Sequence, residues 1–285
     1  MTAENRIEQT VPEEPIAIDA SSPSIATGSA RGAGLAYDIG VAVRPTLLFV
    51  TAFALNATPH EATHAATAYM LGFSSTLYQM WVNPDAAAAT PRQAIAIAVS
   101  GPIFSLTVGL IGWLLYRWRY NRRPSGLLFL MFAIVAFYIP LGGSIGGDIR
   151  LALRIGGSSN LLMNAISIVA GLILSAMMYF MGKELFSWAP PWFSRSQAVL
   201  CTTVGPWLLG TLLMTLVYLP IPKFLIAPNL IGSAFWAFAV IGASVSKRTI
   251  QAARPICSLT PADLIVTAAA LVMVRSLVHG LRLAH

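Results

Sequence analysis

Residues 41–72 read VAVRPTLLFVTAFALNATPHEATHAATAYMLG, an apolar stretch that carries two histidines and a glutamate near its end. About 20 helical residues cross a hydrocarbon core roughly 30 Å thick, so this stretch is long enough to span a membrane. A backbone in lipid must satisfy its own hydrogen bonds, which favours an α-helix. The fold is therefore expected to be built from membrane-spanning helices.

The composition of the whole chain agrees with this expectation. Of 285 residues, 56% are hydrophobic and only 10% are charged, whereas an average globular protein has about 25% charged residues. Such a chain cannot cover a water-exposed surface, which excludes a soluble globular domain, a disordered chain and a coiled coil. The only cysteines are Cys201 and Cys257, too few for a disulfide framework or a four-cysteine metal cluster.

Further apolar stretches of membrane length follow the first one. They predict an all-α polytopic membrane protein with six to seven transmembrane helices. The expected spans are 41–57 continuing to 72, 93–116, 126–141, 161–182, 196–219, 229–246 and 261–281. The last span could instead lie along the membrane interface, because Arg275, His279 and Arg282 fall on one helical stripe.

The charged residues are unevenly distributed. Residues 1–40 are polar and acidic and are expected to form a disordered tail. With this tail in the cytoplasm, twelve Lys and Arg residues fall on the cytoplasmic side and five on the other, so the positive-inside rule predicts a cytoplasmic N-terminus. Because the basic residues lie in loops between apolar spans, membrane lipid is the expected partner and nucleic acid is not.

The sequence HEATH at 60–64 is the strongest candidate for chemistry. On a helix, residues four apart project from one face, so His60 and His64 can bind one Zn²⁺ ion together. Glu61 then lies beside the site, where it can take a proton from water at the metal and pass it to a leaving amine. The competing interpretation is a pair of packed histidines, but such groups are costly in an apolar span without a metal.

A catalytic zinc site needs a third protein ligand. Beyond the tail the chain has only five acids, namely Glu61, Asp85, Asp148, Glu184 and Asp263. Asp85 and Glu184 are expected in polar loops, and Asp263 follows Thr260 and Pro261 at a helix start, where an acid complements the helix dipole.

Asp148 is the remaining candidate for the third ligand. It ends a stretch that contains Pro140 and four glycines, a break that is tolerated at membrane depth where it lines a cavity. If successive spans alternate in direction, Asp148 and His60 fall in the same half of the membrane. The alternative for Asp148 is an ion pair with Arg150 in an interfacial loop.

With these residues, the chain resembles the site-2 protease family of intramembrane zinc metalloproteases, particularly its compact bacterial members. Three elements match in order: HEATH at 60–64 followed by Leu71-Gly72, the sequence SGPIFSL at 100–106, and the Asp148 segment. The family usually has Asn where this chain has Ser105, and Gly where Ile149 follows Asp148. Familiar members also keep the active site toward the cytoplasm, whereas the charge distribution here places it toward the opposite face.

The resemblance implies a three-helix core that encloses zinc bound by His60, His64 and Asp148. It also implies catalysis by Glu61, substrate contacts from Gly101, Pro102 and Ser105, and a transmembrane-helix protein as substrate. The protease-like core would cover residues 41–160, with additional helices in 161–285, in the inner membrane of a bacterium.

Two further functions stay open at this stage. A non-proteolytic scaffold or sensor would keep the metal site without turnover. An ion-coupled transporter would use the two histidines and the glutamate as an ion relay. A membrane di-iron oxygenase is disfavoured, because four histidines are too few for its ligands.

Overall fold

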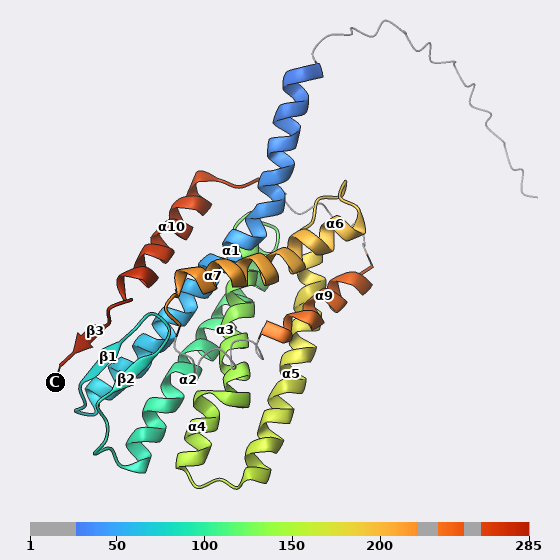
Figure 1. The fold of residues 1–285 in the computed structure, drawn as a ribbon. Helices are drawn as coiled ribbons and strands as arrows, with labels where there is room; N and C mark the ends of the chain where they lie inside the picture. The colour runs from blue at the N-terminus through green and yellow to red at the C-terminus, as the bar shows by residue number, and fades with distance from the viewer. Residues whose placement is uncertain (1–26, 222–232, 248–257, 285) are drawn as a thin grey trace, which may run out of the picture.

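The computed structural model describes residues 27–221, 233–247 and 258–284 as a helical bundle around the long helix α1 (Figure 1). The helices are α1 (Thr27–Met70), α2 (Pro91–Leu115), α3 (Gly126–Gly146), α4 (Asp148–Ile155), α5 (Asn160–Phe186), α6 (Arg195–Val199), α7 (Thr211–Val217), α9 (Trp236–Val245) and α10 (Pro261–Ser276). π-Helical turns occupy Tyr116–Tyr120, Leu200–Val204 and Pro206–Gly210. The last two flank Gly205, where a glycine and a proline interrupt the α-helical hydrogen bonding.

Five helical segments of the described residues are long and apolar enough to cross a membrane. They are Asp38–Met70, Pro91–Tyr120, Gly126–Gly146, Asn160–Phe186 and Arg195–Val217. These segments correspond to the first five spans expected from the sequence, and they are compatible with a polytopic helical membrane protein. The expected span 229–246 falls partly outside the described residues, and its described part is the ten-residue helix α9.

Two boundary predictions from the sequence are wrong. The expected tail 1–40 is too long, because α1 already begins at Thr27; residues 1–26 lie outside the described residues. The expected span 261–281 is also too long, because α10 ends at Ser276 after 16 residues. The side chain of Arg275 donates hydrogen bonds to the backbone carbonyls of Val217 and Leu219, so the end of α10 is fixed against the end of α7.

A small antiparallel sheet, which the sequence did not predict, accompanies the helices. Its strands are β1 (Ser75–Leu77), β2 (Val82–Pro84) and β3 (Leu281–Leu283), in the order β2-β1-β3. The sheet lies beside the C-terminal part of α1 (Figure 1). Each strand has three residues, which is too short for the alternating pattern that identifies strands in a sequence.

Helix α1 organises the core. Its residues Leu48, Val50, Ala52 and Ala54 are almost fully buried in a core cluster that also contains residues of α3, α5 and α9, and α1 packs against α2, α3 and α10. At its membrane entry, the Arg44 guanidinium donates to the Pro124 carbonyl in the α2–α3 loop. The start of the α1 span and this loop therefore share one end of the bundle, while the C-terminus of α1 and α4 lie at the other end (Figure 1).

Local sequence signals fix where several helices begin. The Thr90 hydroxyl accepts from the Gln93 backbone N–H while the Gln93 side chain accepts from the Thr90 N–H, a capping box that starts α2. Thr260 and Asp263 form the same arrangement at the start of α10. Asp263 therefore lies at a helix start, as its position after Thr260 and Pro261 predicts.

Candidate metal centre

The structure brings His60, His64 and Asp148 together. His60 Nε2 lies 3.2 Å from Asp148 Oδ2, and His64 Nε2 lies 3.5 Å from the same oxygen. The two Nε2 atoms are 3.3 Å apart. One ligand atom from each residue therefore points to a common centre, and the three residues can hold a metal ion.

The two histidines come from adjacent turns of α1, as the spacing of four residues predicts. Both side chains are nearly inaccessible, with His60 2% and His64 3% exposed. Pro59 inside α1 has no N–H to donate, and the Thr63 hydroxyl donates to the Pro59 carbonyl at 2.7 Å.

Asp148 reaches the histidines from the first turn of α4. Helix α3 continues to Gly146, beyond the expected end at 141, and the chain breaks only at Gly147. A Cβ atom at Gly147 would lie 2.9 Å from the Cα of Gly143, so this tight turn requires glycine. Two glycines of the stretch, Gly143 and Gly147, therefore allow the close turn that directs Asp148 inward.

The alternative partner of Asp148 is excluded by the structure. Arg150 donates to Ser167 Oγ and to Asn164 Oδ1, both at 3.0 Å, on helix α5. Burial alone would raise the pKa of the Asp148 carboxyl, but the hydrogen bonds with the two histidines hold the pKa well below its usual value. The site therefore presents a carboxylate anion, the form that binds a cation.

The outer nitrogens of both histidine rings are also bound. His60 Nδ1 lies 2.9 Å from Ser105 Oγ, and Ser105 Oγ donates to Asn56 Oδ1 at 3.1 Å. His64 Nδ1 lies 2.6 Å from the Ile97 carbonyl oxygen. Because a carbonyl oxygen only accepts, His64 Nδ1 is the donor. With both Nδ1 atoms bound, both Nε2 atoms face the centre and Asp148, and each would become a lone-pair ligand when a metal ion replaced the proton between them, which is the pattern of metal-binding histidines.

Helix α2 closes one side of the centre. A Cβ atom at Gly101 would lie 2.7 Å from His60 Nε2 and closer still to His64 Nε2, so only glycine allows α2 to approach the two rings. Gly101, Pro102 and Ser105 were expected to contact substrate. The structure places all three in buried positions, with Gly101 and Ser105 against the histidines.

Glu61 lies next to His60 on α1 and is only partly buried. Within the described part of the chain its carboxylate has no hydrogen-bond partner or ion pair. The other acids after residue 40 are elsewhere: Asp85 is exposed, Glu184 accepts from Tyr116, and Asp263 pairs with Arg44. Glu61 is thus the free carboxylate beside the metal centre.

Sequence reasoning missed two polar residues near the centre. Asn56 lies one helical turn before His60 and gave no motif signal, although it ends the hydrogen-bond chain that starts at His60. Tyr218 lies 157 positions after Glu61, and only the tertiary fold brings it close to Thr58 and Glu61. A polar residue within an apolar span was the only available signal for Asn56.

Comparison of the chain with protein-family models, with curated proteins and with solved structures finds no match in any of the three.

Proposed function

We propose that this protein is an intramembrane zinc metallopeptidase, similar in its site to the site-2 protease family. The observation that carries the proposal is the convergence of His60 Nε2, His64 Nε2 and Asp148 Oδ2 beside the free carboxylate of Glu61. Two imidazoles and one carboxylate are a ligand set found at catalytic zinc sites, which leave one position open.

The spacing of the ligand atoms supports zinc. In a tetrahedral site with ligand distances of roughly 2.0–2.1 Å, neighbouring ligand atoms are about 3.3–3.4 Å apart. The three separations here are 3.2, 3.3 and 3.5 Å. The ligand atoms thus already have the separations that a tetrahedral zinc site needs.

In this mechanism the residues of the chain position the reactants and move the proton. A zinc ion held by the three residues would supply Lewis acidity to polarise water and the substrate carbonyl. Glu61 takes a proton from the attacking water while the oxygen of that water forms a bond to the carbonyl carbon of the substrate. The carbon–nitrogen bond then breaks, and Glu61 passes the proton to the leaving nitrogen. The products are a carboxylic acid and an amine.

The position of the site supports a membrane-embedded substrate. The centre is formed by the last turns of a membrane-spanning helix and by the residues that follow another such helix. A membrane-embedded segment could bring a peptide bond to it after local unwinding, because a helical backbone hides its carbonyls. We therefore propose a single-span protein segment as substrate.

Substitution of Glu61 by Gln tests the proposed function. The purified variant and the wild type are loaded with zinc and mixed with a synthetic single-span peptide that carries a central Asn-Pro-Gly sequence to break its helix. We expect the wild type to cleave the peptide and Glu61→Gln to bind zinc equally well while losing at least 1,000-fold in rate. Glu184→Gln is the matched control, because its amide oxygen can still accept from Tyr116.

The same experiment separates the alternatives. Cleavage by Glu61→Gln at the wild-type rate would refute the mechanism. A wild type that binds one zinc per chain and cleaves no single-span peptide would indicate a metal-binding scaffold. A wild type without zinc that carries a pH-dependent ion flux in liposomes would indicate a transporter.

A further inference from the structure

Three buried polar side chains near Glu61 carry atoms with no hydrogen-bond partner among the described residues. They are the hydroxyls of Thr58 and Tyr218 and the side-chain oxygen of Gln79. Their residues are 5%, 1% and 5% exposed. An unpaired buried polar atom costs about 1–3 kcal/mol, so three together call for a ligand or another explanation.

The three side chains form one group on the Glu61 side of α1. Thr58 precedes Glu61 by three residues, and residues three apart are neighbours on a helix surface. The Tyr218 phenol and the Thr58 hydroxyl lie close to each other without completing a hydrogen bond, and the phenol is within electrostatic reach of Glu61. The Gln79 amide, between β1 and β2, donates to the Tyr218 backbone carbonyl. Unpaired polar atoms from three segments thus lie near one another, and two of them, the hydroxyls of Thr58 and Tyr218, lie on the Glu61 side of α1.

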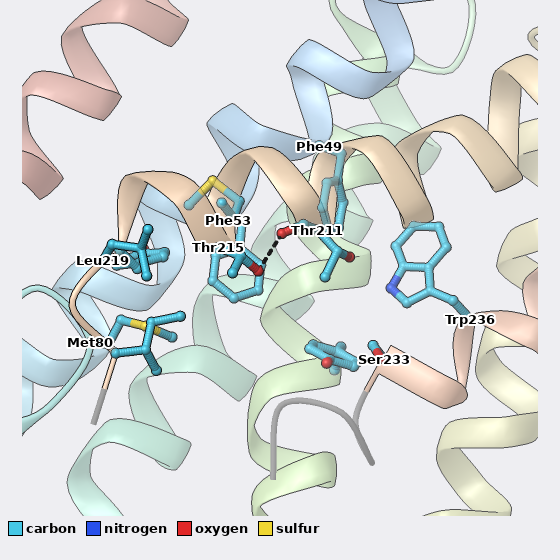
Figure 2. A pocket seen from close by; sticks show the side chains of 12 residues that line it. Phe49, Phe53, Met80, Thr211, Thr215, Leu219, Ser233 and Trp236 are labelled. Atoms are coloured by element: carbon cyan, nitrogen blue, oxygen red, sulfur yellow. Dashed lines mark hydrogen bonds between the residues drawn. The ribbon is translucent and has the colours of Figure 1, made fainter. Parts of the chain in front are cut away.

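An apolar cavity of about 350 Å³ adjoins this group. Figure 2 shows its wall, in which Phe49 and Phe53 of α1 face Met80, Thr215, Leu219 and Trp236. Tyr218 is part of the same wall, with its ring 6.1 Å from the ring of Phe53. A cavity of roughly 150 Å³ lined by apolar side chains binds benzene, so this cavity can take a large apolar side chain.

The group of unpaired atoms and the cavity have complementary chemistry. A peptide in extended form presents alternating N–H donors and carbonyl acceptors, which can pair with Thr58, Tyr218 and Gln79. Its side chains point alternately to either side, so one of them can enter the cavity while the backbone stays beside Glu61. Both features are explained by a single ligand, an unwound peptide segment.

We propose that Tyr218 is a catalytic residue of the peptidase and that the cavity binds the side chain next to the scissile bond. This inference rests on the proposed function. The Tyr218 phenol donates a hydrogen bond to the substrate carbonyl oxygen, and the bond strengthens as negative charge develops on that oxygen. No proton is transferred from the phenol. Preferred substrates then carry an aromatic or large branched residue beside the cleaved bond.

Binding of amino-acid hydroxamates tests the cavity without turnover. A hydroxamate binds zinc, and its side chain probes the neighbouring space. We expect the zinc-loaded wild type to bind leucine and phenylalanine hydroxamates at least about tenfold more tightly than glycine hydroxamate. Met214→Trp, which fills the cavity from its wall, should remove this preference and leave the affinity for glycine hydroxamate unchanged. Equal affinity of the wild type for all three compounds would overturn the assignment of the cavity.

Tyr218→Phe tests the phenol. With the peptide described above, we expect kcat to fall about 100-fold, the loss typical of one donor to a developing oxyanion. KM and zinc content should stay within about twofold. Tyr120→Phe is the control, because Tyr120 stacks on Phe129 far from the centre in a connecting turn. An unchanged kcat in Tyr218→Phe would refute the catalytic role.

A second variant keeps the test valid if Tyr218→Phe does not fold. Thr58→Val preserves the shape of the side chain and removes the other unpaired hydroxyl. We expect it to raise KM for the peptide by about tenfold, and an unchanged KM would contradict the peptide-binding role of the group.

Failure of the proposed function would give a different result. A wild type that binds neither zinc nor any hydroxamate overturns both proposals, whereas one that cleaves without side-chain preference overturns only this inference.

Discussion

The close approach of α2 to the histidines gives a sharp prediction for Gly101→Ala. The added Cβ atom would lie 2.7 Å from His60 Nε2, whereas carbon and nitrogen atoms in contact are normally about 3.5 Å apart. The ring or the helix must therefore move by about 0.8 Å. Metal–ligand distances tolerate only about 0.2 Å, so the substitution should disrupt the site itself.

The size of the effect follows from overpacking. Inserting a methyl group into a packed site costs about 1–3 kcal/mol, and 1.36 kcal/mol corresponds to a factor of ten. Because the strain falls on two ligands at once, we expect the upper end of this range, a loss of about 100-fold in zinc affinity. The helix itself should persist, since alanine is a better helix former than glycine by about 1 kcal/mol.

A chelator competition assay measures this loss. Apo protein in detergent is titrated with zinc in the presence of a chromophoric chelator, for the wild type, for Gly101→Ala and for Gly109→Ala. The control lies on the same helix, where a Cβ atom would meet Ala136 Cβ at 3.0 Å; it should lower thermal stability without changing zinc affinity. If Gly101→Ala binds zinc as tightly as the wild type, the histidines do not converge beneath α2 as described.

Two further predictions concern the surroundings of the centre. Ser105→Ala removes the hydrogen bond to His60 Nδ1 and should weaken zinc binding by about 10- to 100-fold in the same competition assay, whereas Thr107→Ala, on an exposed face of α2, should not. Burial raises the pKa of Asp263, but the hydrogen bonds from Arg44 and Thr260 outweigh it and lower the pKa. This ion pair therefore stabilises the protein above about pH 4, the usual carboxyl pKa, and the stabilisation is lost as the pH falls further. The melting temperature in detergent should fall below about pH 4 for the wild type and should change less with pH for Asp263→Asn. Identical dependence on pH in the two proteins would show that the ion pair does not stabilise the protein.

The convergence of His60, His64 and Asp148 could be predicted largely from the sequence because its strongest signal is local. The spacing of His60 and His64 places both on one helix face, and the scarcity of acids after residue 40 leaves Asp148 as the third ligand. Both inferences need only helix geometry and the cost of charge in lipid. The five long spans were predictable for the same reason, since hydrophobic length is a property of a contiguous segment.

What the sequence could not predict depends on contacts between distant segments. The need for Gly101 appears only when α2 packs against the histidines, and Tyr218 reaches Thr58 only through the packing of α7's end against α1. The sheet was missed because β3 pairs with β1 across about 200 residues and each strand has three residues. The end of α10 was misplaced because it is set by Arg275 and the carbonyls of α7's end.

The zinc content of the purified protein tests the central claim most directly. Wild type, Asp148→Ala and the exposed-acid control Asp85→Ala are purified without chelators, and metal per chain is measured by inductively coupled plasma mass spectrometry. A site built from His60, His64 and Asp148 predicts about one zinc per chain in the wild type and in Asp85→Ala, and a large loss in Asp148→Ala. A wild type without zinc, or an Asp148→Ala variant that retains it fully, would contradict the claim.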